Sequence, residues 1–217
     1  MAAATRGLAR SGMDQGEVAM LELLTGSGLA LSAGLNAFIP MLSIGLLARY
    51  TDLVELPTQW LWLENPWVLV VLGVLLALDV VADKVPAVDH VNDVVQTLVR
   101  PTAGGIVFAA GSSSETHAIT DPGEFFTSSA VVPFLIGLVL ALATHLAKAS
   151  GRAVVNLSTG GVGAPVVSTV EDISSLTMTV LAILVPILVI VFLLTLVAMA
   201  FWIRRRLAQR RRERTLG

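Results

Sequence analysis

The stretch that decides the fold class is "NPWVLVVLGVLLALDVVADKVPAVDHVNDVVQTLVR", residues 65–100. Its first twelve residues carry no charge and are as apolar as the interior of a bilayer. The remaining residues hold a dense set of ionisable side chains, namely Asp79, Asp83, Lys84, Asp89, His90, Asp93 and Arg100. Each ionisable group inside a membrane segment costs roughly 2.5–3.5 kcal/mol. This charged stretch is therefore the first candidate for a functional site.

The composition of the whole chain indicates an integral membrane protein. Of its 217 residues, 55% are hydrophobic and only 14% are charged, whereas a soluble domain carries about a quarter charged residues. The net charge of −2 gives no reason to expect a nucleic-acid partner, so the expected environment is the lipid bilayer. Because the chain has no cysteine, disulfides, thiolate metal sites and cysteine nucleophiles are excluded.

Outward from this stretch, the apolar segments predict an all-α, polytopic membrane fold with about six segments. They cover residues 23–48, 65–82, 94–111, 125–144, 153–170 and 173–203. The third and fifth are weak, because Gly104-Gly105 interrupts one and Gly160-Gly161 the other. We expect these two segments to be broken or re-entrant, since irregular backbone survives at membrane depth only where protein or water covers it.

An internal similarity suggests two related halves. Residues 71–84 ("VLGVLLALDVVADK") align without gaps with residues 135–148 ("LIGLVLALATHLAK"), and both end on a lysine. We therefore expect a transmembrane domain of residues 20–203 with halves at about 20–111 and 125–203, as a tandem or inverted repeat. Paired broken segments in two such halves point to the binding site of a transporter. Ordinary helices with glycines for tight packing explain the same pattern.

The tails and loops predict an orientation. Residues 204–217 form a basic tail in which Arg204 to Arg214 contribute seven of the fourteen Lys and Arg. The positive-inside rule places this tail in the cytoplasm, where it is expected to contact anionic lipids. With six crossings, the tail of residues 1–19 is cytoplasmic too, and the loops of residues 51–66 and 112–128 face outward. The expected location is the bacterial cytoplasmic membrane, as a single protein, a homo-oligomer or part of a larger complex.

The charged stretch itself divides at Pro86. Asp79 and Asp83 are four residues apart and share a helix face. After Pro86, a single polar stripe at helical spacing predicts an amphipathic helix with its acidic side turned inward, formed by Asp89, Asp93, Gln96 and Arg100. The candidate residues for binding a substrate or ion are Asn36, Asp79, Asp83, Lys84, Asp89, Asp93, Arg100, Gly104, Gly105, Lys148, Arg152, Asn156, Gly160 and Gly161.

Other polar residues fit structural roles. Glu171 and Asp172 are expected to cap the start of the last helix, where negative charge suits the helix dipole. Lone histidines such as His145 are typical of membrane boundaries. No serine has a base in its sequence pattern, so nucleophilic catalysis has no support.

Three kinds of function fit these residues. The first is a small transporter or channel-like permeation protein for an ion, a proton-coupled solute or an anionic lipid headgroup. The second is an accessory or scaffold subunit of a larger membrane complex. The third is a metal-dependent membrane enzyme acting on a phospholipid or isoprenoid. The sequence requires no cofactor, but a divalent cation is compatible with the candidate metal ligands Asp79, Asp83, Asp89 and Asp93.

Four phrases resemble those of a bacterial membrane family catalogued as domain of unknown function 4126. They are "AGLNAFIP" (residues 33–40), "ADKVPAVDHVND" (82–93), "VRPTAGG" (99–105) and "PVVSTVED" (165–172). The similarity runs from about Gly26 to Pro186. It implies an integral membrane fold and carries no assigned activity or catalytic residue.

Overall fold

The computed structural model describes residues 15–112, 131–160, 162–189, 191 and 194. Within these residues the protein is helical and without strands, as the sequence predicted. The helices are α2 (Gln15–Leu35), α3 (Phe38–Tyr50), η1 (Thr58–Glu64), α4 (Pro66–Ala82), α5 (Pro86–Ser112), α7 (Val131–Thr159) and α8 (Ala164–Leu184). The basic tail, the first fourteen residues and the loop of residues 113–130 lie outside the described residues.

Several helices are long and apolar enough to cross a membrane. By length and composition these are Gly16–Leu35, Val131–Thr159 and Ala164–Leu184. A fourth candidate span arises if η1 and α4 are taken together, although they meet at an angle of 64°. Helices of this length and composition indicate a membrane protein.

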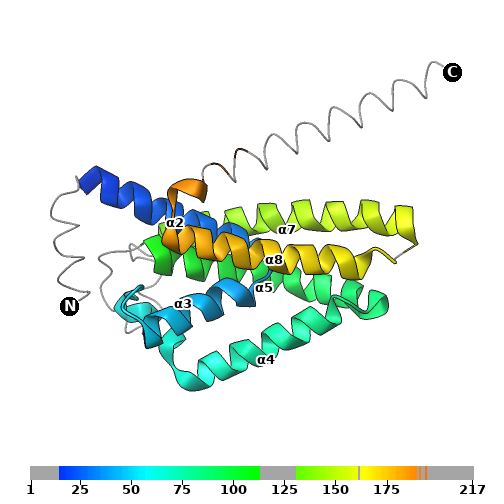
Figure 1. The fold of residues 1–217 in the computed structure, drawn as a ribbon, viewed down its shortest axis with the longest axis horizontal. Coiled ribbons are helices and arrows are strands. Elements are labelled where there is room, and N and C mark those ends of the chain that lie inside the picture. Colours follow the sequence, from blue (N-terminus) through cyan, green and yellow to red (C-terminus); the bar gives the residue numbers. More distant parts are fainter. Residues whose placement is uncertain (1–14, 113–130, 161, 190, 192–193, 195–217) are drawn as a thin grey trace, which may run out of the picture.

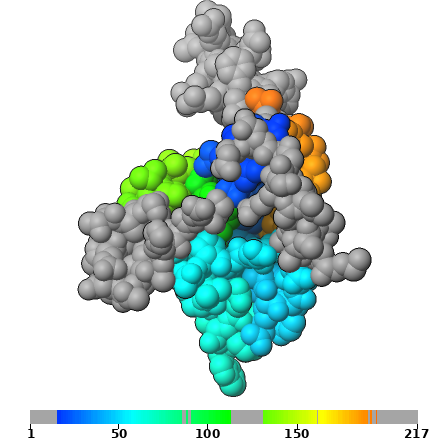
Figure 2. Space-filling view, turned by 90° about the vertical axis from the view of Figure 1, so that its left-hand side faces the viewer, coloured from blue at the N-terminus to red at the C-terminus, as the bar shows by residue number. Residues whose placement is uncertain are grey.

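The helices form one elongated bundle. Figure 1 shows α2, α5, α7 and α8 running side by side, with α4 crossing at an angle along one side. In the same view α2 extends from one end of the bundle to its middle, and α3 returns toward that end. Figure 2 looks at this end and shows α3, η1 and α4 (cyan) as one mass beneath α2 (dark blue). The α2–α3 hairpin thus enters and leaves the bundle at a single end.

The hairpin bends at Asn36 for a local reason. The Asn36 Oδ1 atom accepts hydrogen bonds from the backbone N–H groups of Phe38 (3.0 Å) and Ile39 (3.3 Å), so it caps the start of α3. Pro40 lies in the first turn of α3, where a missing N–H group leaves no hydrogen bond unmade. The break therefore falls inside the first apolar segment, which the sequence predicted as a single span.

The third segment is not broken, contrary to the sequence prediction. Residues 94–111 belong to α5, a helix of 27 residues that continues through Pro101. A Cβ atom on Gly105 would lie 2.6 Å from the Phe134 ring, and one on Gly104 would meet Ala141, both on α7. These glycines allow α5 and α7 to approach closely; their low hydropathy does not mark unwound backbone.

The fifth segment is not a separate span either. The first part of residues 153–170 continues α7 to Thr159, and the last part begins α8 at Ala164. Gly160 follows α7 with φ of +61°, a left-handed conformation that glycine adopts without strain. Gly160 and Gly163 therefore belong to the turn between α7 and α8.

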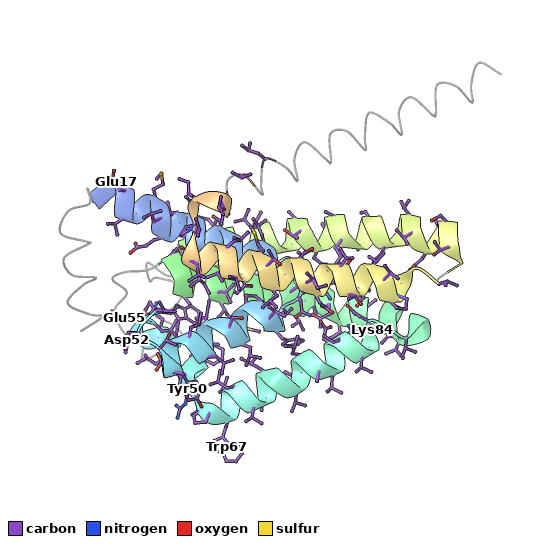
Figure 3. The ribbon with its side chains drawn as sticks, viewed as in Figure 1. Glu17, Tyr50, Asp52, Glu55, Trp67 and Lys84 are labelled. Carbon is purple, nitrogen blue, oxygen red and sulfur yellow. The ribbon has the colours of Figure 1, made fainter. Side chains whose placement is uncertain are left out.

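The α2–α3 hairpin brings the beginning of α2 and the loop after α3 to one end of the bundle. Figure 3 shows Glu17 at the same end of the bundle as Asp52 and Glu55, while Lys84 lies toward the other end. Since the α2–α3 hairpin returns to the end where it started, the beginning of α2 and the loop of residues 51–57 share one side. The six-segment prediction, in contrast, placed residues 1–19 and residues 51–66 on opposite sides of the membrane.

In the first half of α5 the exposed side is apolar and the buried side is polar. Val91, Val94 and Leu98 are 63–77% exposed, whereas Gln96 and Arg100 are at most 3% exposed. A soluble helix places these residue types the other way round. This arrangement fits an environment of lipid around the bundle and confirms that the polar stripe faces inward at Gln96 and Arg100.

Candidate functional site

A buried group of polar and charged side chains lies at the level of the α2–α3 break, and we call it the charged cluster. Its members come from the break itself and from α4, α5, α7 and α8, with Asp83 directly after α4. They are Asn36, Asp79, Asp83, Asn92, Asp93, Gln96, Arg100, His145, Lys148, Arg152, Glu171 and Asp172. Lys84 lies at its edge, 3.8 Å from Asp172.

Asp79 is held mainly by neutral amides. Its Oδ1 atom accepts hydrogen bonds of 2.7 Å from both Asn92 Nδ2 and Gln96 Nε2. Its Oδ2 atom accepts one of 3.1 Å from Asn36 Nδ2, and Arg100 Nη2 is 3.9 Å away. Asp79 as a whole is 3% exposed, so its carboxyl group is surrounded by protein atoms, among them those of the hairpin and α5.

Asp83 and Glu171 are held by two bases from α7. Arg152 Nη2 donates to Asp83 Oδ2 (3.0 Å) and to Glu171 Oε2 (2.7 Å), and Arg152 Nε donates to Glu171 Oε2 (3.0 Å). Lys148 Nζ is 3.1 Å from Glu171 Oε2 and 3.6 Å from Asp83 Oδ2. This four-residue ion-pair network connects the end of α4 to α7 and α8.

The two half-helix ends at the break contact the charged cluster directly. Lys148 Nζ donates a hydrogen bond of 2.9 Å to the carbonyl oxygen of Leu35, the last residue of α2, where a cation suits the helix dipole. Asn36 also donates through Nδ2 to Asp172 Oδ1 at 3.0 Å. The break in the hairpin is therefore built into the same network as the buried charges.

Arg100 and His145 form the remaining part of the charged cluster. Arg100 is fully buried, and its Nη1 atom lies 3.3 Å from His145 Nδ1. Because arginine can only donate, His145 Nδ1 accepts, and its Nε2–H then donates to Thr97 Oγ1 at 3.1 Å. His145 is consequently neutral. The Nε and Nη2 atoms of Arg100 and the Oε1 atom of Gln96 have no hydrogen-bond partner among the described residues.

Comparison of the sequence with protein-family models places the chain in a known family. The model described as "Domain of unknown function (DUF4126)" matches residues 23–206. The chain belongs to the DUF4126 family. This confirms the resemblance seen in the sequence, and it assigns no activity. Comparisons with curated proteins and with solved structures gave no significant match.

In this DUF4126 protein, half of the residues predicted from sequence come together. Asn36, Asp79, Asp83, Asp93, Arg100, Lys148 and Arg152 all belong to the charged cluster, with Lys84 at its edge. Asn156 lies one turn beyond Arg152 on α7, and its Oδ1 atom is buried without a hydrogen-bond partner among the described residues. Gly104, Gly105 and Gly160 serve packing and a turn, as described above. Gly161 and the side chain of Asp89 lie outside the described residues.

The sequence prediction for Glu171 and Asp172 was wrong. α8 begins at Ala164, so Glu171 and Asp172 lie about two turns inside it and do not cap its start. Glu171 is 9% exposed and binds Lys148 and Arg152. The signal that could have revealed it is the occurrence of two acids within an otherwise uncharged stretch, since buried acids in membranes need a basic partner.

The neutral members of the charged cluster were also overlooked. Asn92, Gln96 and His145 contribute hydrogen bonds to Asp79 or Arg100 but were not among the candidate residues. Gln96 stands in the predicted stripe, so its position on the buried face was available from helical spacing alone. Its importance depends on the acid that it faces across the bundle, which spacing cannot show.

The described side chains of this DUF4126 protein do not form a metal site. Among them, no group of three or more His, Asp or Glu residues is arranged to hold a metal ion. Asp79 and Asp83 share a hydrogen-bond donor, Asn92 Nδ2, at 2.7 and 2.8 Å, and they face Arg100. Asp79 and Asp83 are therefore surrounded by N–H donors.

Proposed function

We propose that this protein is a small transporter or channel-like permeation protein whose pathway passes the charged cluster. The observation that carries the proposal is the position of that cluster. Three carboxylates (Asp79, Asp83 and Glu171) and three bases are buried at the break of a helix hairpin, inside a bundle whose outer face is apolar. Ionisable groups in such a place are typical of ion and substrate pathways, and half-helix ends at membrane depth are typical of transporters.

The contacts favour a cation or a proton over an anionic headgroup as the permeating species. Lys148 and Arg152 are each within 3.1 Å of Glu171 and already bind acidic partners. An anionic headgroup would have to displace these carboxylates from the buried bases. Asp79, in contrast, has neutral donors within hydrogen-bond distance, so its charge is the least compensated of the buried acids.

The same proposal includes a topology. α4, α5, α7 and α8 cross the bacterial cytoplasmic membrane, and the α2–α3 hairpin is re-entrant. This arrangement takes the place of six crossings in two related halves. The end that carries Glu17, Asp52 and Glu55 faces outward, because Lys and Arg are retained on the cytoplasmic side. Four crossings bring the chain back to the outward side, so a cytoplasmic basic tail requires one more crossing after α8, for which the uncharged residues 185–203 are long enough.

The experiment that tests the function is a flux measurement in reconstituted vesicles. Purified protein is placed in liposomes, and fluxes of H⁺, Na⁺, K⁺ and short-chain lipid phosphates are followed. We expect at least one flux above protein-free vesicles and its loss in Asp79→Asn, which keeps the side-chain size and removes the charge. The matched control is Glu55→Gln, an exposed acid at the end of the bundle, which should leave the flux unchanged.

Either of two results would count against permeation. Flux that is unaltered in Asp79→Asn would remove the charged cluster from the pathway. Absence of every tested flux, together with a partner that co-purifies in fixed proportion, would favour the accessory-subunit alternative. A phospholipid- or isoprenoid-converting activity in the purified protein would favour the enzyme alternative.

A further inference from the structure

The charge balance of the charged cluster is uneven. Its ionised members, apart from the Lys84–Asp172 pair, are the acids Asp79, Asp83, Asp93 and Glu171 and the bases Arg100, Lys148 and Arg152. The four acids exceed the three bases by one negative charge among the described side chains, since His145 is neutral by its hydrogen bonds. Asp93 is partly exposed, so the buried acids and bases are three each. Inside a membrane, a buried acid that has no base within hydrogen-bond distance favours binding of a positive charge.

The contacts indicate which buried acid has no base within hydrogen-bond distance. Asp83 and Glu171 share Lys148 and Arg152 within 3.6 Å and are balanced by them. Asp93 is partly exposed, whereas the Asp79 side chain is 1% exposed and its nearest base is 3.9 Å away.

Charged groups reach Asp79 from every element around it. They are Arg100 on α5, Asp83 beyond α4, Lys148 on α7 and Asp172 on α8, the last through Asn36.

The neighbouring glutamine provides the second, independent observation. Gln96 is 3% exposed, its Nε2 atom donates to Asp79 Oδ1, and its Oε1 atom has no hydrogen-bond partner among the described residues. A carboxylate needs a donor at this position, whereas a protonated carboxyl group needs an acceptor. Rotation of the amide by half a turn exchanges Nε2 for Oε1, so Gln96 can serve both protonation states of Asp79.

On these grounds, and resting on the proposed function, we propose that Asp79 binds one exchangeable proton and that H⁺ is the permeating or coupling ion. The proton adds to a carboxylate oxygen of Asp79, and the new O–H group donates to Gln96 Oε1. The same proton leaves to solvent on the other side of the pathway. A metal cation fits less well, because the two oxygens of Asp79 already accept three N–H groups.

The test is infrared difference spectroscopy of the full chain in nanodiscs, between alkaline and acidic pH. We expect the C=O stretch of a buried carboxylic acid to appear on acidification. It should shift when the protein is labelled with [4-¹³C]aspartate, which separates aspartate from Glu171. The band should be lost in Asp79→Asn and retained in Asp93→Asn, the matched control on the other incompletely paired acid.

Further variants keep the test decisive if Asp79→Asn does not fold. Gln96→Leu removes the acceptor, so the carboxylic-acid band should move to the higher frequency of a C=O group in an unbonded acid. Asp79→Glu should replace the aspartate band by one that is insensitive to the aspartate label. Loss of the band in Asp93→Asn, or its suppression by Na⁺ at constant pH, would overturn the assignment.

Flux in vesicles separates this proposal from the function on which it depends. Acidification of the vesicle interior in response to a pH gradient, abolished in Asp79→Asn, supports both. A flux in the wild-type protein that ignores the pH gradient, without an aspartate band, overturns the proton site and leaves the permeation function standing. An aspartate band without any flux retains the proton site and overturns the permeation function.

Discussion

Close packing between α2 and α8 gives a prediction that can be worked from distances. A Cβ atom on Gly28 would lie 2.6 Å from Ala182 Cβ and 2.8 Å from Val189 Cγ2. Carbon atoms in contact are normally about 3.5–4.0 Å apart. Gly28→Ala therefore forces the two helices to separate by about 0.9 Å or more.

Separation of the two helices also breaks hydrogen bonds one turn further along α2. Ser32 Oγ bonds to the Ser175 carbonyl at 2.8 Å and to Thr179 Oγ1 at 2.7 Å, and a displacement of this size takes both beyond hydrogen-bond range. Overpacking costs about 1–3 kcal/mol and each membrane hydrogen bond about 0.6 kcal/mol. We expect Gly28→Ala to be about 2–4 kcal/mol less stable than a control without the clash.

The control is the same substitution where space is free. A Cβ atom on Gly151, in the middle of α7, has nothing within 4 Å, so Gly151→Ala should stabilise the protein by about 0.5–1 kcal/mol through helix propensity. The assay is reversible unfolding in bicelles or mild detergent, with both variants measured against the wild type. The double variant Gly28→Ala/Ala182→Gly moves the methyl group from one helix to the other and should recover at least half of the loss. Equal effects of Gly28→Ala and Gly151→Ala would refute the packing described here.

Three further predictions follow from the buried contacts and the hairpin. Arg152→Met should destabilise the protein by about 3–5 kcal/mol in the same unfolding assay, because Glu171 keeps its buried charge and loses a base. Adding Glu171→Leu should restore much of the lost stability. Strictly additive effects of the two substitutions would contradict the ion pair. Ser32→Ala should cost about 1–2 kcal/mol through its lost hydrogen bonds, and an unchanged stability would show that α2 and α8 do not meet there. Because the chain has no cysteine, Glu17→Cys and Glu55→Cys should react with a membrane-impermeant maleimide from the same side of the membrane; reaction from opposite sides would exclude the re-entrant hairpin.

The break in the membrane segments shows where sequence reasoning fails. Low hydropathy at Gly104 and Gly105 predicted a broken helix, but α5 is continuous and the glycines lie against α7. The actual break is at Asn36, in a more apolar segment. Hydropathy is an average over a segment, so it does not distinguish a glycine at a close helix contact from a glycine in unwound backbone. An asparagine with a proline four residues later was the available local signal for a helix start.

The charged stretch was predicted better, because the face on which a residue lies depends only on spacing within one helix. Asp93, Gln96 and Arg100 fall on one face of a helix by spacing alone, and that face proved to be the buried one. Their partners could not be predicted in the same way. Arg152 binds Glu171, nineteen residues away, and Lys148 binds the carbonyl oxygen of Leu35, 113 residues away.

By itself, the sequence determined that this chain is a helical membrane protein whose polar stripe turns Gln96 and Arg100 inward, since hydropathy and helical period depend on neighbouring residues only. The tertiary structure alone decided that the first segment folds back at Asn36 and that Lys148, Arg152 and Glu171 share one site with Asp83. It also decided that Asp79 faces amides while Asp83 faces bases. The physical reason is that a buried charge is stabilised by groups within a few ångströms in space, and only the packing of the helices brings those groups together.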